Sequence, residues 1–213
     1  GGKVLASGTA GCIFKPPLLC QGQKERSVGM VTKLMTTSDA ETEYDIIKYF
    51  QPIISTIPNN EEYFVLNQIT KCKPQTYTEE DMSNFKEKCS ALIDQGITKA
   101  LVASQTEKGR IMGLQLPDGG MDLRDYLAAN KMDSNKIIEV NNALIKLITK
   151  GISPMNKAGI IHNDLKAPNI VYDERTKSAK IIDWGLADIV KNPQVLPRTN
   201  LPLMYNQPFT NLL

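Results

Sequence analysis

Residues 160–188 constrain this chain more than any other segment. They place the only histidine, two well-separated aspartates, a lysine and an asparagine between two apolar runs that are typical of strands. From His162 to Asn169 the layout is H-x-D-L-x-x-x-N, and a D-W-G turn begins at Asp183, nineteen residues after Asp164 (183 minus 164). Polar groups of these kinds, gathered between apolar strands, indicate a catalytic loop.

The two motifs resemble the catalytic loop and the metal-binding turn of protein kinases, H-R-D-L-x-x-x-N and D-F-G. The resemblance implies that Asp164 orients and deprotonates an attacking hydroxyl, and that Lys166 neutralises charge on the transferring phosphoryl group. It also implies that Asn169 and Asp183 hold magnesium, which prefers hard oxygen ligands. A single His-x-Asp is more often a packed or surface pair, so the interpretation depends on both motifs occurring together.

A turn of small residues near the N-terminus separates two expected strands, residues 3–6 and 12–14. Set against G-x-G-x-x-G-x-V, it has alanine in place of the first glycine. Small residues let backbone N–H groups approach phosphate oxygens. The expected nucleotide contacts here are Ala6, Ser7, Gly8, Thr9, Gly11 and Ile13. A plain β-hairpin turn explains the two glycines about as well.

Residues 28–35 have the pattern of a strand that carries Lys33. Its place one strand after the glycine turn resembles that of the V-A-I-K lysine, which contacts the α- and β-phosphates. Most lysines in strands face solvent, so this residue alone indicates little. By the same resemblance, Val31 would cover the adenine ring, where kinases commonly carry alanine.

Residues 38–50 open with N-cap chemistry and continue with apolar residues at helical spacing. We expect this helix to carry the glutamate that pairs with Lys33. Glu43 is our choice, because Ile47 would face inward beside it one turn later. Glu41 is the competing choice, and an ordinary exposed glutamate is the alternative.

Between this helix and the catalytic loop we expect a strand at residues 63–69, an inserted amphipathic helix at 78–95 and a strand at 110–116. The resemblance makes Leu114 the gatekeeper. Gln115, Leu116 and Pro117 then form the hinge that contacts adenine. Because proline has no N–H, one usual backbone donor to the adenine ring would be missing.

Residues 134–158 have the pattern of a long helix that leads into the catalytic loop. The segment that follows contains one more expected nucleotide contact and three departures from the kinase motifs. Val171 would form the floor of the adenine pocket, and Trp184 replaces the phenylalanine of D-F-G. Asn163 replaces the arginine that gathers a phosphorylated activation loop, so we do not expect control by that route. Pro208 falls where the proline of A-P-E belongs, but Phe209 follows it.

Composition and cysteine usage limit the partners and the compartment that we expect for this chain. The chain has 213 residues, 41% hydrophobic and 23% charged, with a net charge of +2. This predicts no general affinity for nucleic acid or an anionic membrane, and no apolar run approaches the roughly eighteen residues that span a bilayer. The cysteines are dispersed, so we expect free, mostly buried thiols in a reducing cytosol. They are Cys12, Cys20, Cys72 and Cys89.

Taken together, the motifs resemble the divergent serine/threonine protein kinases of large DNA viruses. The resemblance implies an α+β, two-lobed fold, with a small antiparallel sheet and helix in an N-lobe (residues 1–114) and a mainly helical C-lobe (115–213). It implies ATP and magnesium as cofactors, a protein substrate, and the host cytoplasm or virion as location. The C-lobe would be truncated after the activation segment, leaving apolar surface for a second chain to cover.

Two other functions stay open from the residues alone. A small-molecule kinase of the choline or aminoglycoside type carries similar H-N-D-L and I-D-W motifs, although Lys166 and the D-G-G linker favour a protein kinase. A pseudokinase would keep the fold as a binding module without the chemistry. Asn163, Pro117 and the short separation of Lys33 and Glu43 leave that alternative open.

Overall fold

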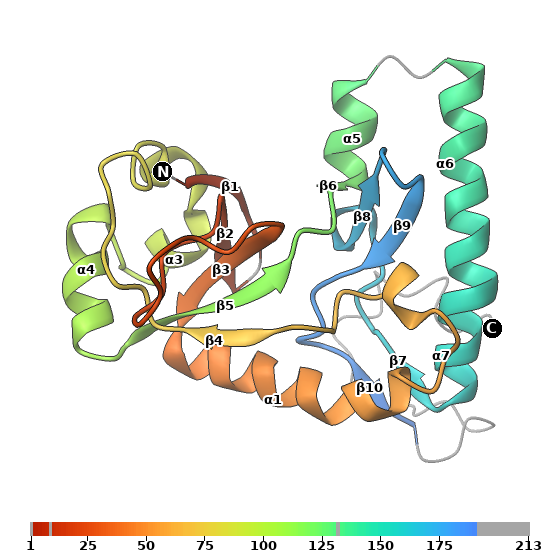
Figure 1. The fold of residues 1–213 in the computed structure, drawn as a ribbon, viewed down its shortest axis with the longest axis horizontal. Helices are drawn as coiled ribbons and strands as arrows, with labels where there is room; N and C mark the ends of the chain where they lie inside the picture. Colours follow the sequence, from red (N-terminus) through yellow and green to blue (C-terminus); the bar gives the residue numbers. More distant parts are fainter. Residues whose placement is uncertain (1, 9, 131–132, 191–213) are drawn as a thin grey trace. The chain divides into compact units, whose positions relative to one another are not determined.

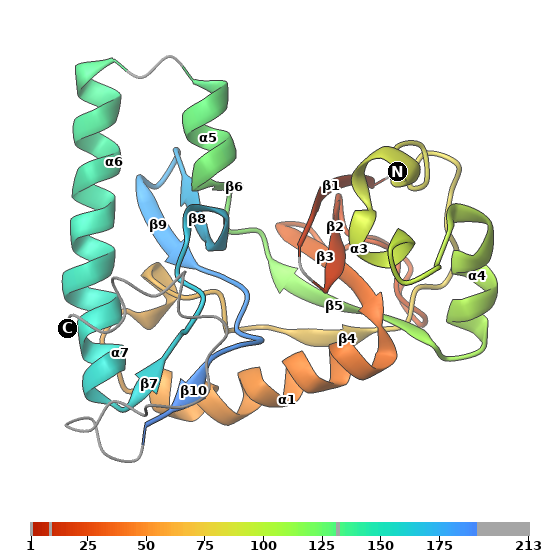
Figure 2. The same ribbon diagram turned by 180° about the vertical axis from the view of Figure 1, so that it is seen from behind.

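The structure, a computed structural model, describes residues 2–8, 10–130 and 133–190 (Figures 1 and 2). The chain divides into two compact units. Unit 1 contains Gly1–Asp45 and Asn67–Asp118, and unit 2 contains Ile46–Leu66 and Gly119–Leu213. Residues 46–66, expected in the first lobe, therefore group with unit 2.

Unit 1 is built on an antiparallel sheet with the strand order β1-β2-β3-β5-β4. The strands are β1 (Lys3–Ser7), β2 (Gly11–Lys15), β3 (Met30–Thr36), β4 (Thr70–Cys72) and β5 (Ile111–Pro117). The expected strands at residues 3–6, 12–14, 28–35 and 110–116 are confirmed, with small shifts at their ends. The central strand β3 is buried from residue 31 to 35, because neighbouring elements cover both of its faces.

The helix expected at residues 38–50 is α1 (Thr37–Ile54). It begins with a reciprocal cap between Thr36 and Asp39: the Asp39 N–H donates to Thr36 Oγ1 at 3.2 Å, and this hydroxyl donates to the Asp39 carboxylate at 2.7 Å. This exchange satisfies an N–H that the first helical turn cannot pair. Ile47 is buried, as its spacing from Glu43 predicts.

The expectation of a strand at residues 63–69 is wrong. The short helix η1 (Asn60–Glu62) ends just before this segment, and Gln68 adopts a left-handed conformation with φ of 60°. Residues 63–66 are buried in succession, which a half-exposed alternating strand would not show. Phe64 forms only an isolated bridge, to Ile181. The apolar run therefore reflects burial in unit 2.

The expectation of one helix at residues 78–95 is also wrong. Two one-turn helices, α2 (Phe85–Lys88) and α3 (Ser90–Ile93), meet at Cys89, whose φ of −113° and ψ of 57° are not helical. The apolar positions were nevertheless correct, because Met82, Phe85 and Leu92 are buried in the core of unit 1. A further helix, α4 (Lys99–Glu107), follows and was not anticipated.

The expectation of free thiols is wrong as well. Cys12 is bonded to Cys89 and Cys20 to Cys72, so no cysteine is free among the described residues. The partners lie 77 and 52 residues apart in the chain. They meet only because the sheet brings distant segments together, which cysteine spacing does not encode.

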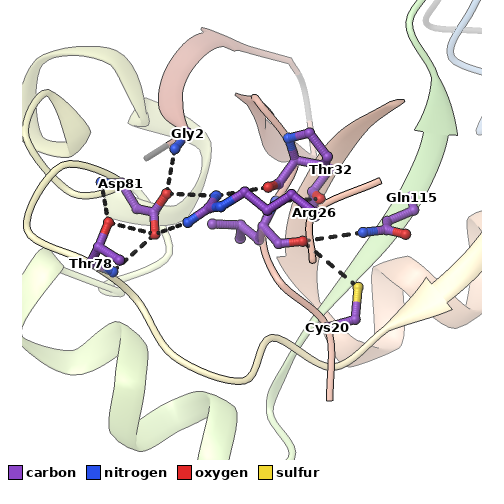
Figure 3. Close-up of polar contacts among 9 residues, drawn as sticks. Gly2, Cys20, Arg26, Thr32, Thr78, Asp81 and Gln115 are labelled. Atoms are coloured by element: carbon purple, nitrogen blue, oxygen red, sulfur yellow. Dashed lines mark hydrogen bonds and ion pairs between the residues drawn. The ribbon is translucent and has the colours of Figure 1, made fainter. Parts of the chain in front are cut away.

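A buried carboxylate holds the inserted segment to the backbone just before β1 and to the loop after β2 (Figure 3). Asp81 is 0% exposed and accepts hydrogen bonds from the Gly2 N–H and from both terminal nitrogens of Arg26. The Thr78 N–H and hydroxyl also donate to it. Burial by itself raises the pKa of Asp81, but the hydrogen bonds from Arg26 and Thr78 outweigh it and hold the pKa below its usual value.

Unit 2 combines helices with two small sheets. One sheet has the order β6-β8-β9, and a second pairs β7 with β10. The strands are β6 (Met121–Asp122), β7 (Ile160–Ile161), β8 (Ile170–Asp173), β9 (Ser178–Ile181) and β10 (Asp188–Ile189). Both views show α5 (Leu123–Ala129) and α6 (Ser134–Lys146) beside the β8–β9 hairpin (Figures 1 and 2).

The long helix expected at residues 134–158 is confirmed, with an irregular turn. α6 continues into the π-helical turn η2 (Leu147–Ile152) and then into α7 (Ser153–Lys157). A Cβ added to Gly151 would lie 2.8 Å from Tyr63 Cβ, so glycine allows the close approach at this turn. Among the helices that the structure describes, none combines the length and apolarity needed to cross a bilayer.

Candidate active site

The strand register of unit 1 places most of the expected nucleotide contacts on one face of the sheet. Residues directly opposite each other on neighbouring strands share a face. Lys33 pairs with Ile13 on β2 and with Leu114 on β5, so these three side chains share a face. By the same rule, Ala6, Val31 and Leu116 lie on that face as well. The pairs that define this face are Ala6 with Ile13, Ile13 with Lys33, Lys33 with Leu114, and Val31 with Leu116.

Lys33 and Glu43 form a buried ion pair on this face. The Lys33 ammonium lies 2.9 and 2.6 Å from the two carboxylate oxygens of Glu43. The residues are 5% and 6% exposed, so the pair compensates charges that are largely removed from water. The competing choice, Glu41, is exposed on the same helix. A fixed, desolvated lysine at this position can donate to phosphate oxygens.

Gln115 lies on the opposite face, because it pairs with Thr32. Its amide NH₂ group donates to the Leu18 carbonyl at 3.1 Å, and its amide oxygen accepts from Gln23 and Ser27 at 3.3 Å each. The side chain therefore anchors the loop after β2, and a contact between Gln115 and adenine would have to use its backbone. The register alone separates it from Leu114 and Leu116.

The glycine turn is closed by a hydrogen bond from the Gly8 N–H to the Gly11 carbonyl, at 2.8 Å. A Cβ at Gly11 would lie only 2.6 Å from the Leu34 carbonyl oxygen, so the approach of β3 requires glycine here. Gly11 thus has a packing role that is independent of any phosphate. Thr9, expected to contact nucleotide, lies outside the described residues.

The catalytic loop of unit 2 gathers three of the expected residues around one carboxylate. Asp164 Oδ2 lies 2.8 Å from the Lys166 ammonium and accepts a hydrogen bond from Asn169 Nδ2 at 2.7 Å. Asn169 Nδ2 also donates to the Asp164 backbone carbonyl at 2.9 Å. The turn of η3 (Ala167–Asn169) brings the amide back over the aspartate. Asp164 is thereby held in one orientation, with a cation beside it.

His162 joins this loop to the D-W-G turn. Its Nε2 lies 3.0 Å from the Ile182 carbonyl, which can only accept, so Nε2 carries the proton. The Ile182 N–H in turn donates to the Asn169 carbonyl at 3.0 Å. The histidine is buried, and burial lowers its pKa below the ordinary 6.5. The sequence motif identified His162 without assigning it this linking role.

A backbone hydrogen bond links the two residues expected to bind metal. The Ile182 N–H donates to the Asn169 carbonyl, and Asp183 directly follows Ile182. Asp183 has a φ of 64°, a conformation that non-glycine residues adopt rarely and at functional sites more often than elsewhere. Asn169 directs its NH₂ group to Asp164, which leaves its amide oxygen as the atom for a cation. Oxygen ligands of this kind suit magnesium.

The donor set fits a magnesium ion that also binds phosphate. Among the described residues there is no group of three or more His, Cys, Asp or Glu side chains that could enclose a metal. Magnesium commonly takes one or two protein oxygens and completes its shell with waters and substrate phosphates. Asn169 and Asp183 would supply those protein oxygens.

An aromatic cluster under the D-W-G turn was not anticipated. Trp184 is 1% exposed, and its ring centroid lies 5.2 Å from that of His162, 5.7 Å from Phe64 and 6.4 Å from Phe50. Within the described residues, the indole N–H has no hydrogen-bond partner. The packing thus fixes the turn next to Asp183. Phe50 and Phe64 lie more than a hundred residues away, so only their hydrophobicity could have suggested this role.

Two further expected residues have clear surroundings. Val171 is buried on β8, and a Cβ at Gly119 would lie 2.5 Å from its Cγ2. The glycine linker therefore packs directly on Val171. Asn163 has a φ of 61°, which asparagine tolerates better than most residues, and its Nδ2 donates to the Leu186 carbonyl at 3.1 Å. Pro208 and Phe209 lie outside the described residues.

Comparison with known proteins supports the same family. The family model described as protein kinase domain matches residues 54–208. Cell division control protein 2 homolog D of Antirrhinum majus is 34% identical over 67 residues, which is 31% of this chain and 22% of that protein. Cyclin-dependent kinase B2-1 of Oryza sativa subsp. japonica is 31% identical over 67 residues, 31% of this chain and 21% of that protein.

A third relative covers more of this chain. The hormonally up-regulated neu tumor-associated kinase homolog of Xenopus tropicalis is 27% identical over 120 residues, 55% of this chain and 16% of that protein. The chain thus matches about a fifth of the length of these relatives. The family match begins after Lys33 and Glu43, yet the structure places both in a five-stranded antiparallel sheet with a helix. With its catalytic loop and a family match over most of its length, the chain belongs to the protein kinase domain family.

Proposed function

We propose that this chain is an ATP- and magnesium-dependent serine/threonine protein kinase. The observation that carries the proposal is the arrangement around Asp164, whose carboxylate contacts both the Lys166 ammonium and the Asn169 amide. A carboxylate must be held within reach of the attacking hydroxyl to accept its proton, and a neighbouring cation must stabilise the transferring group. One loop of this chain supplies both the carboxylate and the cation, which supports the proposal.

Each residue then has a separate task. Asp164 orients the substrate hydroxyl and accepts its proton, while Lys166 donates to the phosphoryl oxygens as negative charge shifts among them. Asn169 and Asp183 would hold magnesium, which would neutralise negative charge on the phosphates of ATP. The proton leaves the hydroxyl as the new oxygen–phosphorus bond forms, and ADP departs with the bridging oxygen.

Unit 1 would supply the nucleotide contacts. The apolar face that contains Ala6, Ile13, Val31, Leu114 and Leu116 suits an adenine ring. Lys33, held by Glu43, would bind the α- and β-phosphates. We propose that Val171 also contacts the adenine ring and that Gly8 and Gly11 lie beside the phosphates. The backbones of Gln115 and Leu116 would provide the polar contacts.

Two alternatives predict different products. A choline- or aminoglycoside-type kinase would phosphorylate a small molecule, and Lys166 beside Asp164 argues against it. A pseudokinase would bind nucleotide without transfer. The complete set of Lys33, Glu43, Asp164, Asn169 and Asp183 argues against the pseudokinase, because a binding module needs no buried base held by an amide.

A transfer assay with labelled ATP separates these functions. The protein is incubated with magnesium and, in separate reactions, a generic basic protein, choline and an aminoglycoside. We expect label on serine or threonine of the basic protein. Asp164→Asn should lower the rate by a factor of about 10² to 10⁴, the usual contribution of a general base. Asp125→Asn changes an exposed aspartate and should leave the rate unaltered.

Each outcome favours one function. Label on a small molecule alone would establish the second type of kinase and contradict the protein-kinase proposal. Nucleotide binding without any transfer, identical in wild type and Asp164→Asn, would establish a pseudokinase.

We also propose that a second chain contacts unit 2 along α6 and η2. Ile137, Ile138, Ile145 and Ile148 are between 42% and 58% exposed, which is unusual for isoleucine. Replacing Ile138 and Ile145 with serine should shift the molecular mass measured by light scattering to that of a monomer. A wild-type protein that is already monomeric at high concentration would contradict a second copy as the partner.

The source and location stay proposals that rest on the motif resemblance alone. We propose a large DNA virus as the source and the host cytoplasm or the virion as the place of action. The two disulfides bear on the proposed cytoplasmic location, because glutathione keeps most cytosolic thiols reduced. Mass spectrometry of protein alkylated in intact cells would show whether the disulfides are present there.

A further inference from the structure

The inserted segment 81–91 follows the outer edge of the N-terminal strand of unit 1. Among the described strands, β1 lies at the edge of the sheet and pairs with β2 alone. The Asn84 side chain occupies that edge: its amide oxygen accepts from the Val4 N–H at 3.0 Å, and its NH₂ group donates to the Val4 carbonyl at 2.8 Å. Asp81 accepts from the Gly2 N–H at 2.6 Å. One short segment therefore pairs with the backbone of Val4 on β1 and with the N–H of Gly2 just before the strand.

The same segment holds both ends of the glycine turn. Before the turn, Ser7 Oγ accepts hydrogen bonds from the Ala91 N–H at 2.9 Å and from the Ser90 hydroxyl at 3.2 Å. After the turn, Cys12 is bonded covalently to Cys89. Ser7 was expected to contact nucleotide, and because its hydroxyl is engaged by the segment, such a contact would use its backbone. Gly8 and Gly11 thus lie between two residues that the segment holds, Ser7 and Cys12.

A turn held in this way loses less conformational entropy when it closes on a phosphate group. We propose that segment 81–91 positions the glycine turn for nucleotide binding, and that the Cys12–Cys89 disulfide makes nucleotide affinity depend on redox state. The inference rests on the proposed kinase function, which makes the turn a phosphate site. Ser7 and the disulfide act as positioning groups, since they hold the turn without touching the reacting atoms.

The redox step uses a dithiol as reductant. The dithiol supplies two electrons and two protons to the Cys12–Cys89 bond, which becomes two thiols, while the dithiol itself closes to a cyclic disulfide. The turn then keeps the hydrogen bonds to Ser7 and its own bond from the Gly8 N–H to the Gly11 carbonyl, but it loses the covalent link between Cys12 and the segment. The second disulfide, Cys20–Cys72, joins the loop after β2 to β4 at the opposite edge of the sheet. It provides a matched control.

The experiment compares two double variants of the whole chain, C12S/C89S and C20S/C72S. The dissociation constant for magnesium-ATP, KM for ATP, kcat and the unfolding midpoint are measured for each. We expect C12S/C89S to raise the dissociation constant and KM for ATP about threefold to tenfold, the effect of losing one or two modest interactions. Its kcat should stay within about twofold. C20S/C72S should lower the midpoint without weakening nucleotide binding.

A second measurement avoids dependence on how the variants fold. In C20S/C72S, dithiothreitol can reduce only Cys12–Cys89, so it should weaken nucleotide binding there and have no effect on C12S/C89S. Amide hydrogen exchange of residues 7–12 should accelerate in the same reduced sample. Ser7→Ala should raise KM for ATP. Ser7→Thr retains the hydroxyl, so its KM for ATP should equal that of wild type.

The results separate this inference from the proposed function. If wild type binds ATP and reduction changes neither its affinity nor the exchange of residues 7–12, the inference is wrong while the kinase proposal stands. If C20S/C72S weakens nucleotide binding as much as C12S/C89S, the effect is one of general stability and the positioning role is refuted. A wild-type protein that binds no nucleotide overturns the proposed function and this inference with it.

Discussion

The Lys33 ammonium contacts both carboxylate oxygens of Glu43, at 2.9 and 2.6 Å, although neither residue has more than a small exposed surface. The pair joins the central strand of the unit 1 sheet to the first half of α1. Removing one partner leaves the other charge buried with less compensation. The resulting loss of folding free energy is larger than the net stabilisation that the intact pair provides.

Glu43→Gln tests this pair. It keeps the shape of the side chain and removes its charge, so we expect the free energy of unfolding to fall by about 3 kcal/mol and KM for ATP to rise. Glu41→Gln, at an exposed position of the same helix, should change neither. Urea unfolding and initial rates measure both effects. Equal behaviour of the two variants would show that Lys33 does not depend on Glu43.

Asp183→Asn tests the proposed metal ligand without disturbing the backbone. Asparagine adopts left-handed conformations at least as readily as aspartate, so the φ of 64° should be retained. We expect transfer to be abolished and the magnesium-dependent part of nucleotide affinity to be lost. Affinity in the presence of EDTA should stay the same. Titration calorimetry with and without magnesium measures this, and Asp188→Asn is the control at an exposed aspartate.

Trp184→Ala should lower the free energy of unfolding by about 3 to 5 kcal/mol, because it removes a large buried ring from the cluster with His162 and Phe64. Trp184→Phe should cost much less, since it retains an aromatic ring and eliminates a buried N–H that lacks a partner in the described structure. Circular dichroism during urea unfolding measures both. Equal losses would mean that ring packing is not what holds the turn.

His162 predicts a loss of stability on mild acidification. Burial lowers its pKa in the folded state below 6.5, so the unfolded chain binds the proton more tightly. As pH falls below 6.5, the free energy of unfolding should decrease by up to about 1.4 kcal/mol per pH unit, until the folded-state pKa is reached. Above pH 6.5 this contribution is fully present.

The matched variant is His162→Gln, which can still donate to the Ile182 carbonyl but does not titrate. Its stability should depend less on pH between 7.5 and 5.5 than that of wild type, as measured by urea unfolding at each pH. The chain has one histidine, so its imidazole resonances can be followed by NMR without ambiguity. Titration of the folded protein near pH 6.5 would contradict the prediction.

The sequence predicted best where the chemistry is local. Asp164, Lys166 and Asn169 lie within six residues, so the chain itself keeps them together whatever surrounds the loop. The match of Lys33 with Glu43 needed one further step, the helical spacing to Ile47, and the buried ion pair agrees with it. The alternation of side chains along the strands was also sufficient to group Val31 with Lys33 and Leu114 with Leu116.

Errors arose where a segment takes its conformation from distant partners. Residues 63–66 form an apolar run that is buried in unit 2, and a strand and a buried loop can share such a composition. Segment 78–95 has helical spacing, yet the chain breaks at Cys89, where the covalent bond to Cys12 holds it. Neither constraint can be read from the local sequence.

By itself, the sequence predicted the H-N-D-L-K-A-P-N loop, the D-W-G turn and the period of the strands and helices, because each depends on residues near one another in the chain. Only the tertiary structure decided that Ser7 and Cys12 are held by segment 81–91, that Gln115 faces away from Lys33, and that Trp184 packs between His162 and Phe64. These relationships join segments 20 to 120 residues apart or depend on strand register, and both are set by the packing of the whole domain rather than by local preference.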